Sequence, residues 1–98
     1  MGNSLKSARF LIESRLQDAA RGNVEACFEL GMVYSSGAAG ADIDLIEAHK
    51  WFNLAALNGN SRAQECRAEI AEDMSSADIA EAQKQARAWL QTANRRAA

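Results

Sequence analysis

The sequence of 98 residues contains no proline, and only eight of its residues are valine, isoleucine or threonine. Proline breaks helix interiors, and β-branched residues lose side-chain freedom in a helix. Alanine, the residue with the highest helix propensity, supplies 21 positions. The composition therefore predicts an all-α fold, and the length fits a single domain over residues 1–98.

Long apolar runs are also missing. The longest early run, Phe10-Leu11-Ile12, is shorter than the roughly 7–15 residues of a signal-peptide core and the roughly 18–20 of a membrane span. The opening MGNSLKS carries Lys6 where a myristoylation signal needs serine or threonine. We therefore expect a cytoplasmic protein with no membrane insertion.

An excess of basic charge is absent. Eleven lysines and arginines stand against thirteen acidic residues, which gives a net charge of −2 and an isoelectric point of about 5.3. Domains that bind nucleic acid usually have a basic stripe and a high isoelectric point. The adjacent pair Arg95-Arg96 lies in what we expect to be a solvated tail, residues 94–98, so no nucleic-acid partner is predicted.

Groups able to hold a metal or perform catalysis are few. A structural zinc site needs about four closely spaced ligands, whereas this chain has two distant cysteines, Cys27 and Cys66, and one histidine, His49. Apolar neighbours predict that both thiols are buried and reduced, and Glu25 and Glu29 would raise the pKa of Cys27. His49 is interpreted as a surface residue without an oriented partner. We expect no metal, no cofactor, no catalytic residue and no enzyme activity.

Hydrophobic periodicity divides the chain into helices. The predicted helices cover residues 4–20, 24–35, 44–57, 61–73 and 77–93, and they would pack antiparallel. Two glycines and little apolar content make residues 36–42 a loop. Ser75 or Ser76 offers an N-cap for the last helix, and Asp78, three residues after Ser75, would complete a capping box.

The chain repeats part of itself. The segment QDAARGNVEA (17–26) matches LAALNGNSRA (54–63) at an offset of 37, and Ala48, Trp51 and Ala55 match Ala86, Trp89 and Ala93 at an offset of 38. A period of 33–47 residues built from paired helices is typical of an α-solenoid. The corresponding places of Trp51 and Trp89 predict a shared packing role.

The segment EACFELGMVYSSGAAGADIDLIEAHKWFNLAALNGN resembles the Sel-one-like repeat family, which is related to the tetratricopeptide repeat. The matching residues are Ala26, Leu30, Gly31, Tyr34 and Gly37 in the first half, and Asp44, Ala48, Trp51, Phe52, Ala55, Ala56 and Gly59 in the second. The resemblance implies a short α-solenoid in which Gly31 and the alanines allow close helix contact and the aromatics fill the space between helices. It is firm over residues 20–63 and looser to Ala93.

The resemblance also implies an internal organisation. An N-terminal helix (4–22) precedes a full repeat (23–59), a degenerate closing repeat (60–93) and the tail (94–98). The family's Gly-Val before the acidic residue is absent, and the loop after Gly37 is one residue longer than usual. In the closing repeat, Arg67 and Ala68 replace the family's leucine and glycine. Terminal repeats need a more polar outer face for solubility, which the second repeat would supply.

What such repeats imply about function is protein binding. We expect an adaptor or small accessory subunit that binds another protein through its helical surface. The first helix of each repeat lines the concave face in this family, which places Glu25, Glu29 and Met32 there as a candidate site for a basic, partly apolar peptide. An ordinary solvated helix face is the alternative interpretation of these three residues.

Two other functions stay open. A cysteine-dependent hydrolase would require Cys27 or Cys66 to be exposed and paired with His49. A purely structural homo-oligomer is the second alternative, because two repeats are fewer than the roughly three that a stable solenoid needs. The sequence does not identify the partner.

Overall fold

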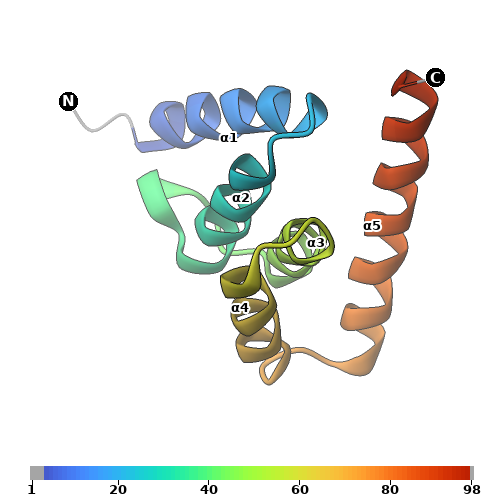
Figure 1. The fold of residues 1–98 in the computed structure, drawn as a ribbon. Helices are drawn as coiled ribbons and strands as arrows, with labels where there is room; N and C mark the ends of the chain where they lie inside the picture. The colour runs from blue at the N-terminus through green and yellow to red at the C-terminus, as the bar shows by residue number, and fades with distance from the viewer. Residues whose placement is uncertain (1–3, 98) are drawn as a thin grey trace.

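A computed structural model of the chain describes residues 4–97, which form five α-helices and one 3₁₀ turn (Figure 1). The elements are α1 (Ser4–Ala20), α2 (Val24–Ser36), η1 (Ala38–Gly40), α3 (Leu45–Leu57), α4 (Ser61–Ala71) and α5 (Ser76–Ala97). Within these residues there is no strand, so the predicted all-α class is confirmed. The first four helices lie within two residues of their predicted ends.

The fifth helix is longer than predicted. Residues 94–97, which belong to the predicted tail, continue α5 as helix. The segment Asn94-Arg95-Arg96-Ala97 contains no glycine or proline to stop a helix, and arginine and alanine are strong helix formers.

Polar side chains cap four of the helix starts. Each accepts a hydrogen bond from the backbone N–H three residues later, at 2.9 to 3.1 Å. The capping residues are Asn23, Asp44, Asn60 and Ser75. Such caps satisfy backbone donors that have no partner inside the helix. The predicted Ser75 cap is therefore confirmed. The role of the motif residue Asp44 is to cap the start of α3.

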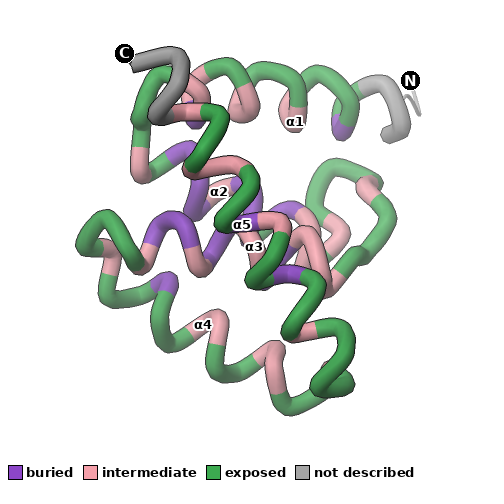
Figure 2. The backbone as a smooth tube through the Cα atoms, turned by 90° about the vertical axis from the view of Figure 1, so that its right-hand side faces the viewer, coloured by how far each residue is buried: buried purple, intermediate pink, exposed green. Residues whose placement is uncertain are grey.

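The third helix is the centre of the molecule. Helices α2, α4 and α5 all pack on α3, while α1 packs on α2 and on the η1 turn. The buried residues accordingly gather along α2 and α3, and the outer sides of α1, α4 and α5 are largely exposed (Figure 2). The predicted enclosure of α2 between neighbouring helices is confirmed.

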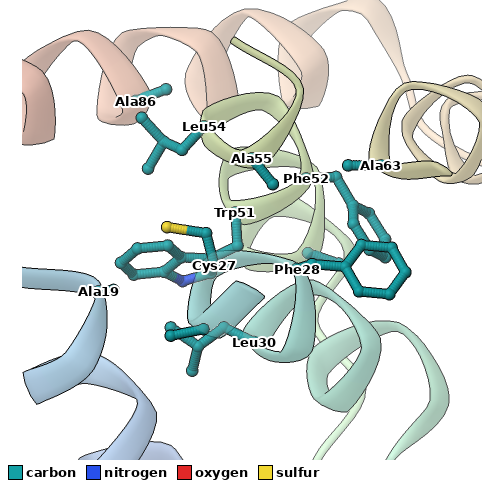
Figure 3. Packing of buried hydrophobic residues seen from close by; sticks show 12 residues of the cluster. Ala19, Cys27, Phe28, Leu30, Trp51, Phe52, Leu54, Ala55, Ala63 and Ala86 are labelled. Carbon is teal, nitrogen blue, oxygen red and sulfur yellow. The ribbon is translucent and has the colours of Figure 1, made fainter. Parts of the chain in front are cut away.

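Aromatic side chains fill the core on two sides of α3 (Figure 3). On one side Phe52 meets Phe28 of α2, with ring centroids 5.8 Å apart. On the other, Trp51 meets Trp89 of α5 in an edge-to-face arrangement at 4.8 Å. The predicted packing role of the two tryptophans is confirmed, and they pack directly against each other.

A close contact between α2 and α3 depends on Gly31. This residue is buried, and a Cβ atom added to it would overlap the ring of Phe52. The other residues that match the repeat family lie on α2 and α3 or at the ends of these helices. Ala26, Leu30, Ala48, Trp51, Phe52 and Ala55 are buried, Tyr34, Gly37 and Ala56 are half-buried, and Gly59 adopts φ +99° in the turn after α3.

The second helix pair departs from the first. Helix α5 packs on α3, not on α4, so the pairing seen between α2 and α3 is not reproduced by α4 and α5 in the described residues (Figure 1). Helix α4 buries only Ala63, and its half-buried Cys66 and Ile70 already face the central core. The chain is nevertheless compact, since its radius of gyration of 13.1 Å equals the value of about 13 Å typical of 100 residues.

Candidate functional site

The three residues of the predicted binding face lie on α2. Their spacing of four and three residues places Glu25, Glu29 and Met32 on one side of this helix. Glu25 is exposed, and Met32 keeps 39% of its surface accessible. The prediction of a shared face is consistent with the helix register.

Glu29 differs from the expected free carboxylate. Its Oε1 accepts a hydrogen bond from Nη1 of Arg15 in α1 at 3.1 Å, while Nη2 of Arg15 donates to Asp18 at 2.9 Å. Both side chains are partly screened by the protein, which leaves Glu29 held in an ion pair. The acidic patch on α2 is thus weaker than predicted. No pattern in the sequence predicts this pair, because Arg15 and Glu29 lie in different helices.

The two cysteines are free, with Cys27 buried and Cys66 half-buried. Burial raises the pKa of the Cys27 thiol to about 11. The reactive form of cysteine is the thiolate, which is scarce near neutral pH at such a pKa. The predicted raised pKa of Cys27 is confirmed, although its main cause is burial and not the neighbouring glutamates. The predicted burial is complete for Cys27 and partial for Cys66.

The interpretation of His49 as a surface residue is wrong. Only 4% of its surface is exposed, and its Nδ1 is buried without a hydrogen-bond partner among the described residues. Burial, and then the positive charge of Arg67 in α4, lower its pKa. His49, Phe52 and Ala56 recur at helical spacing along α3, so periodicity could have revealed this burial.

The described residues hold neither a candidate metal site nor a helix able to cross a membrane. Between residues 4 and 97, no three side chains of His, Cys, Asp or Glu gather in a way that could hold a metal ion. No helix in the same range is both long and apolar enough to cross a membrane.

An apolar groove opens where the ends of α1 and α3 and the start of α2 meet α5. It encloses about 290 Å³. Its apolar lining comes from four helices and includes Ala19, Val24, Cys27, Leu54, Trp89 and Leu90. A small adjoining pocket lined by Ala20, Trp89, Thr92 and Ala93 extends it along α5. The groove lies between the end of α1 and the second half of α5, two helices that make little contact with each other.

Two polar residues border this groove. Asn58 at the end of α3 donates its amide hydrogen to the carbonyl oxygen of Leu54 at 2.8 Å, so its side chain is engaged in the helix end. Arg21, which follows α1, is exposed and forms no ion pair within the described part of the chain. The groove thus combines an apolar lining with Arg21, a cation that has no ion-pair partner among the described residues. Sequence reasoning missed it, since its walls come from helices far apart in the chain.

Known proteins offer no guide to this site. No family model matches the chain, and neither a curated protein nor a solved structure matches it. The groove and the α2 face are therefore the two surfaces from which a function can be argued.

Proposed function

We propose that this chain is a protein-binding module, an adaptor or small accessory subunit that docks a partner protein on its helical surface. The observation that carries the proposal is the open groove of about 290 Å³, with its apolar lining and, at its border, Arg21, which forms no ion pair among the described residues. Concave apolar surfaces with a few polar groups are the usual form of binding sites. Partners gain most of their binding energy by placing a large side chain in such a pocket.

The packing of α2 against α3 supports a relation to the Sel-one-like repeats. Gly31 allows the close approach of the two helices, and the ring of Phe52 lies against it, as the resemblance implies. We propose that the chain is a shortened member of this group of repeats. Protein binding is the function that such a relation implies.

The exposed part of the α2 face is a second candidate surface. Glu25 and Met32 remain accessible there, whereas Glu29 is paired with Arg15. A basic partner would meet a single free carboxylate on this face. The groove offers more apolar area and is the stronger candidate.

The cysteine-dependent hydrolase is disfavoured by the state of its candidate residues. Cys27 is buried with a pKa of about 11, and His49 is buried with a lowered pKa. The structural homo-oligomer keeps some support, because Phe10, Ile43 and Leu57 each expose more than 60% of their surface. Sedimentation velocity over a range of concentrations would detect such self-association.

Affinity capture followed by mass spectrometry tests the proposal. The bait would be the wild-type chain, beside Ala20→Trp, which obstructs the groove, and Ala88→Trp, an exposed position on the outer side of α5, as control. A third bait, Glu25→Lys with Met32→Glu, alters the α2 face. We expect a reproducible set of proteins on wild type and Ala88→Trp that is lost on Ala20→Trp.

Circular dichroism melts would show that each bait is folded. Loss of capture on the α2-face bait alone would move the binding site to α2. Wild-type capture no different from that of an unrelated helical bait would contradict the proposed function.

A further inference from the structure

Charge is unevenly distributed along the chain. All thirteen acidic residues lie at or before Glu81, whereas four of the eleven basic residues follow it. These four, Lys84, Arg87, Arg95 and Arg96, all belong to α5. A protein with a net charge of −2 therefore ends in a helix whose last 14 described positions, 84–97, carry only positive charge.

The same half of α5 forms one side of the groove. Trp89, Leu90 and Ala93 line it, Arg87 precedes Leu90 by about one turn, and Arg96 follows Ala93 by about one turn in the helix register. Across the groove, Arg21 adds a further positive charge that is free of ion pairs among the described residues.

Acidic side chains do little to offset this charge. On the α1 side, Asp18 is held by Arg15 at 2.9 Å. Glu25, next to the lining residue Val24, is the nearest exposed acid in sequence. The surroundings of the groove are therefore mainly positive.

The volume of the groove limits what enters it. A cavity of about 150 Å³ holds a benzene molecule, and pockets for whole small ligands run from about 300 to 1,000 Å³. At about 290 Å³, this groove suits one or two large apolar side chains. The basic positions extend further, since Arg87 and Arg96 are about 14 Å apart along the helix axis at 1.5 Å per residue. A complementary ligand must combine an apolar anchor with negative charge spread over a comparable length.

We propose that the groove binds an acidic amphipathic helix of a partner protein, with an apolar side chain of that helix inserted beside Trp89 and its carboxylates facing Arg21 and Arg87. This inference rests on the proposed protein-binding function and specifies its partner. A helix presents apolar anchors on one face and acids beside them, which matches both features of the site. The opposite charge would also accelerate encounter between the two proteins.

Two synthetic peptides of 18 residues test the inference on the full chain. Both carry the same leucine and alanine face, and their polar positions are all glutamate in one and all lysine in the other. Titration into the ¹⁵N-labelled protein would be followed by backbone amide shifts and by tryptophan fluorescence. We expect the glutamate peptide to bind at least tenfold more tightly at low salt, to shift amides in residues 19–24 and 87–93, and to weaken as salt is added.

Variants separate the apolar contact from the charge. Ala20→Trp should reduce the affinity for the glutamate peptide at least tenfold, while Ala88→Trp should leave this affinity unchanged. Arg21→Glu should reduce the affinity for the glutamate peptide more than Lys84→Glu does. Lys84→Glu makes the same change in net charge on the outer side of α5.

Several results would overturn the inference. These are equal affinity for the two peptides, shifts confined to the α2 face, equal effects of the two charge reversals, or no binding of either peptide at millimolar concentration. Self-association that Ala20→Trp abolishes would identify the occupant as a second copy of the chain and also overturn it. In each case the capture experiment still decides the protein-binding function on its own, so the two failures are distinguishable.

Discussion

At the scale of single residues, Gly31 sets the distance between α2 and α3. The side chain that a Cβ atom would meet is Phe52, which is 1% exposed and has no free space to move into. Contacts of this kind explain why a glycine is used inside a helix despite its low helix propensity. The close packing of α2 and α3 therefore depends on the absence of a side chain at position 31.

Gly31→Ala is expected to destabilise the protein by about 1–3 kcal/mol through overpacking, although alanine favours helix formation. Urea denaturation would measure the change. In the Phe52→Ala background the same substitution should cost much less, because the ring it strikes is gone. Equal costs in both backgrounds would show that Gly31 does not contact Phe52 in solution.

His49 makes stability depend on pH. Its pKa in the folded chain lies below the value of 6.5 for a free histidine, because burial and the charge of Arg67 disfavour the protonated form. As pH falls through 6.5, the unfolded chain gains a proton that the folded chain does not, so the free energy of unfolding decreases. The contribution of neutral His49 is fully present above this pH.

We expect the urea midpoint of the wild type to decrease when the pH is lowered from 7.5 to 5.5. His49→Gln should make this decrease smaller. The range stays above the region in which most carboxylates titrate. Parallel pH profiles for the two proteins would mean that another group causes the dependence.

At the scale of the helices, caps decide where each element begins. The Asp44 carboxylate accepts from the N–H of Glu47 at 3.1 Å, and the Asp44 N–H donates to the carbonyl oxygen of Tyr34 at 2.9 Å. Asp44 thus fixes both the start of α3 and its connection to α2. The capping role depends on a side chain at position 44 that is short enough for its oxygen to accept the hydrogen bond from the N–H of Glu47.

Asp44→Ala should lower the free energy of unfolding by about 1 kcal/mol, the usual cost of losing an N-cap. Asp42→Ala is the matched control. Asp42 is an exposed acid two residues earlier, and its removal should change stability by no more than about 0.5 kcal/mol. A similar effect of both substitutions would point to net charge, not capping, as the cause.

Features determined by neighbouring residues were the ones that the sequence allowed us to predict. Periodicity located all five helices, and turn residues such as Gly22, Asn23 and Ser75 located their ends. The internal repeat also predicted a shared packing role for Trp51 and Trp89, and the family resemblance placed Gly31 at a helix contact. These signals depend on spacing within about one repeat.

Features formed between distant helices escaped prediction. The Arg15–Glu29 ion pair joins two helices, and the groove near Arg21 requires knowing that α5 leaves α4 and packs on α3. His49 was misjudged because it is polar, although its spacing with Phe52 and Ala56 places it on a buried side of α3. The site is therefore mainly a product of tertiary arrangement.

At the scale of the whole molecule, α5 depends on α3 for its position. The main aromatic contact between them is the pair Trp51 and Trp89, with ring centroids 4.8 Å apart. Helix α5 packs mainly on α3 and has no comparable packing on α4 in the described residues. Elements with fewer buried contacts open more readily than the rest of a protein.

Trp89→Ala is expected to reduce stability by up to about 3 kcal/mol, below the cost for a fully buried tryptophan because Trp89 is half-buried. Amide hydrogen exchange should show protection lost in α5 more than in α2 and α3. Gln91→Ala, an exposed change on the same helix, should leave exchange unaltered. A uniform loss across all helices would show that α5 does not open separately.

The independence of α4 and α5 has a practical use in protein engineering. Residues 72–75 join two helices that α3 already holds in place, so this linker does not have to hold them together. Lengthening a flexible loop costs only about 0.6 kcal/mol for each doubling. The linker lies at the start of α5, whose 22 residues span about 33 Å, while the groove lies towards its other end. An epitope tag or a fluorophore-bearing loop inserted just before Ser75 would leave the cap of α5 and the groove in place, which makes this position suitable for immobilising or labelling the chain.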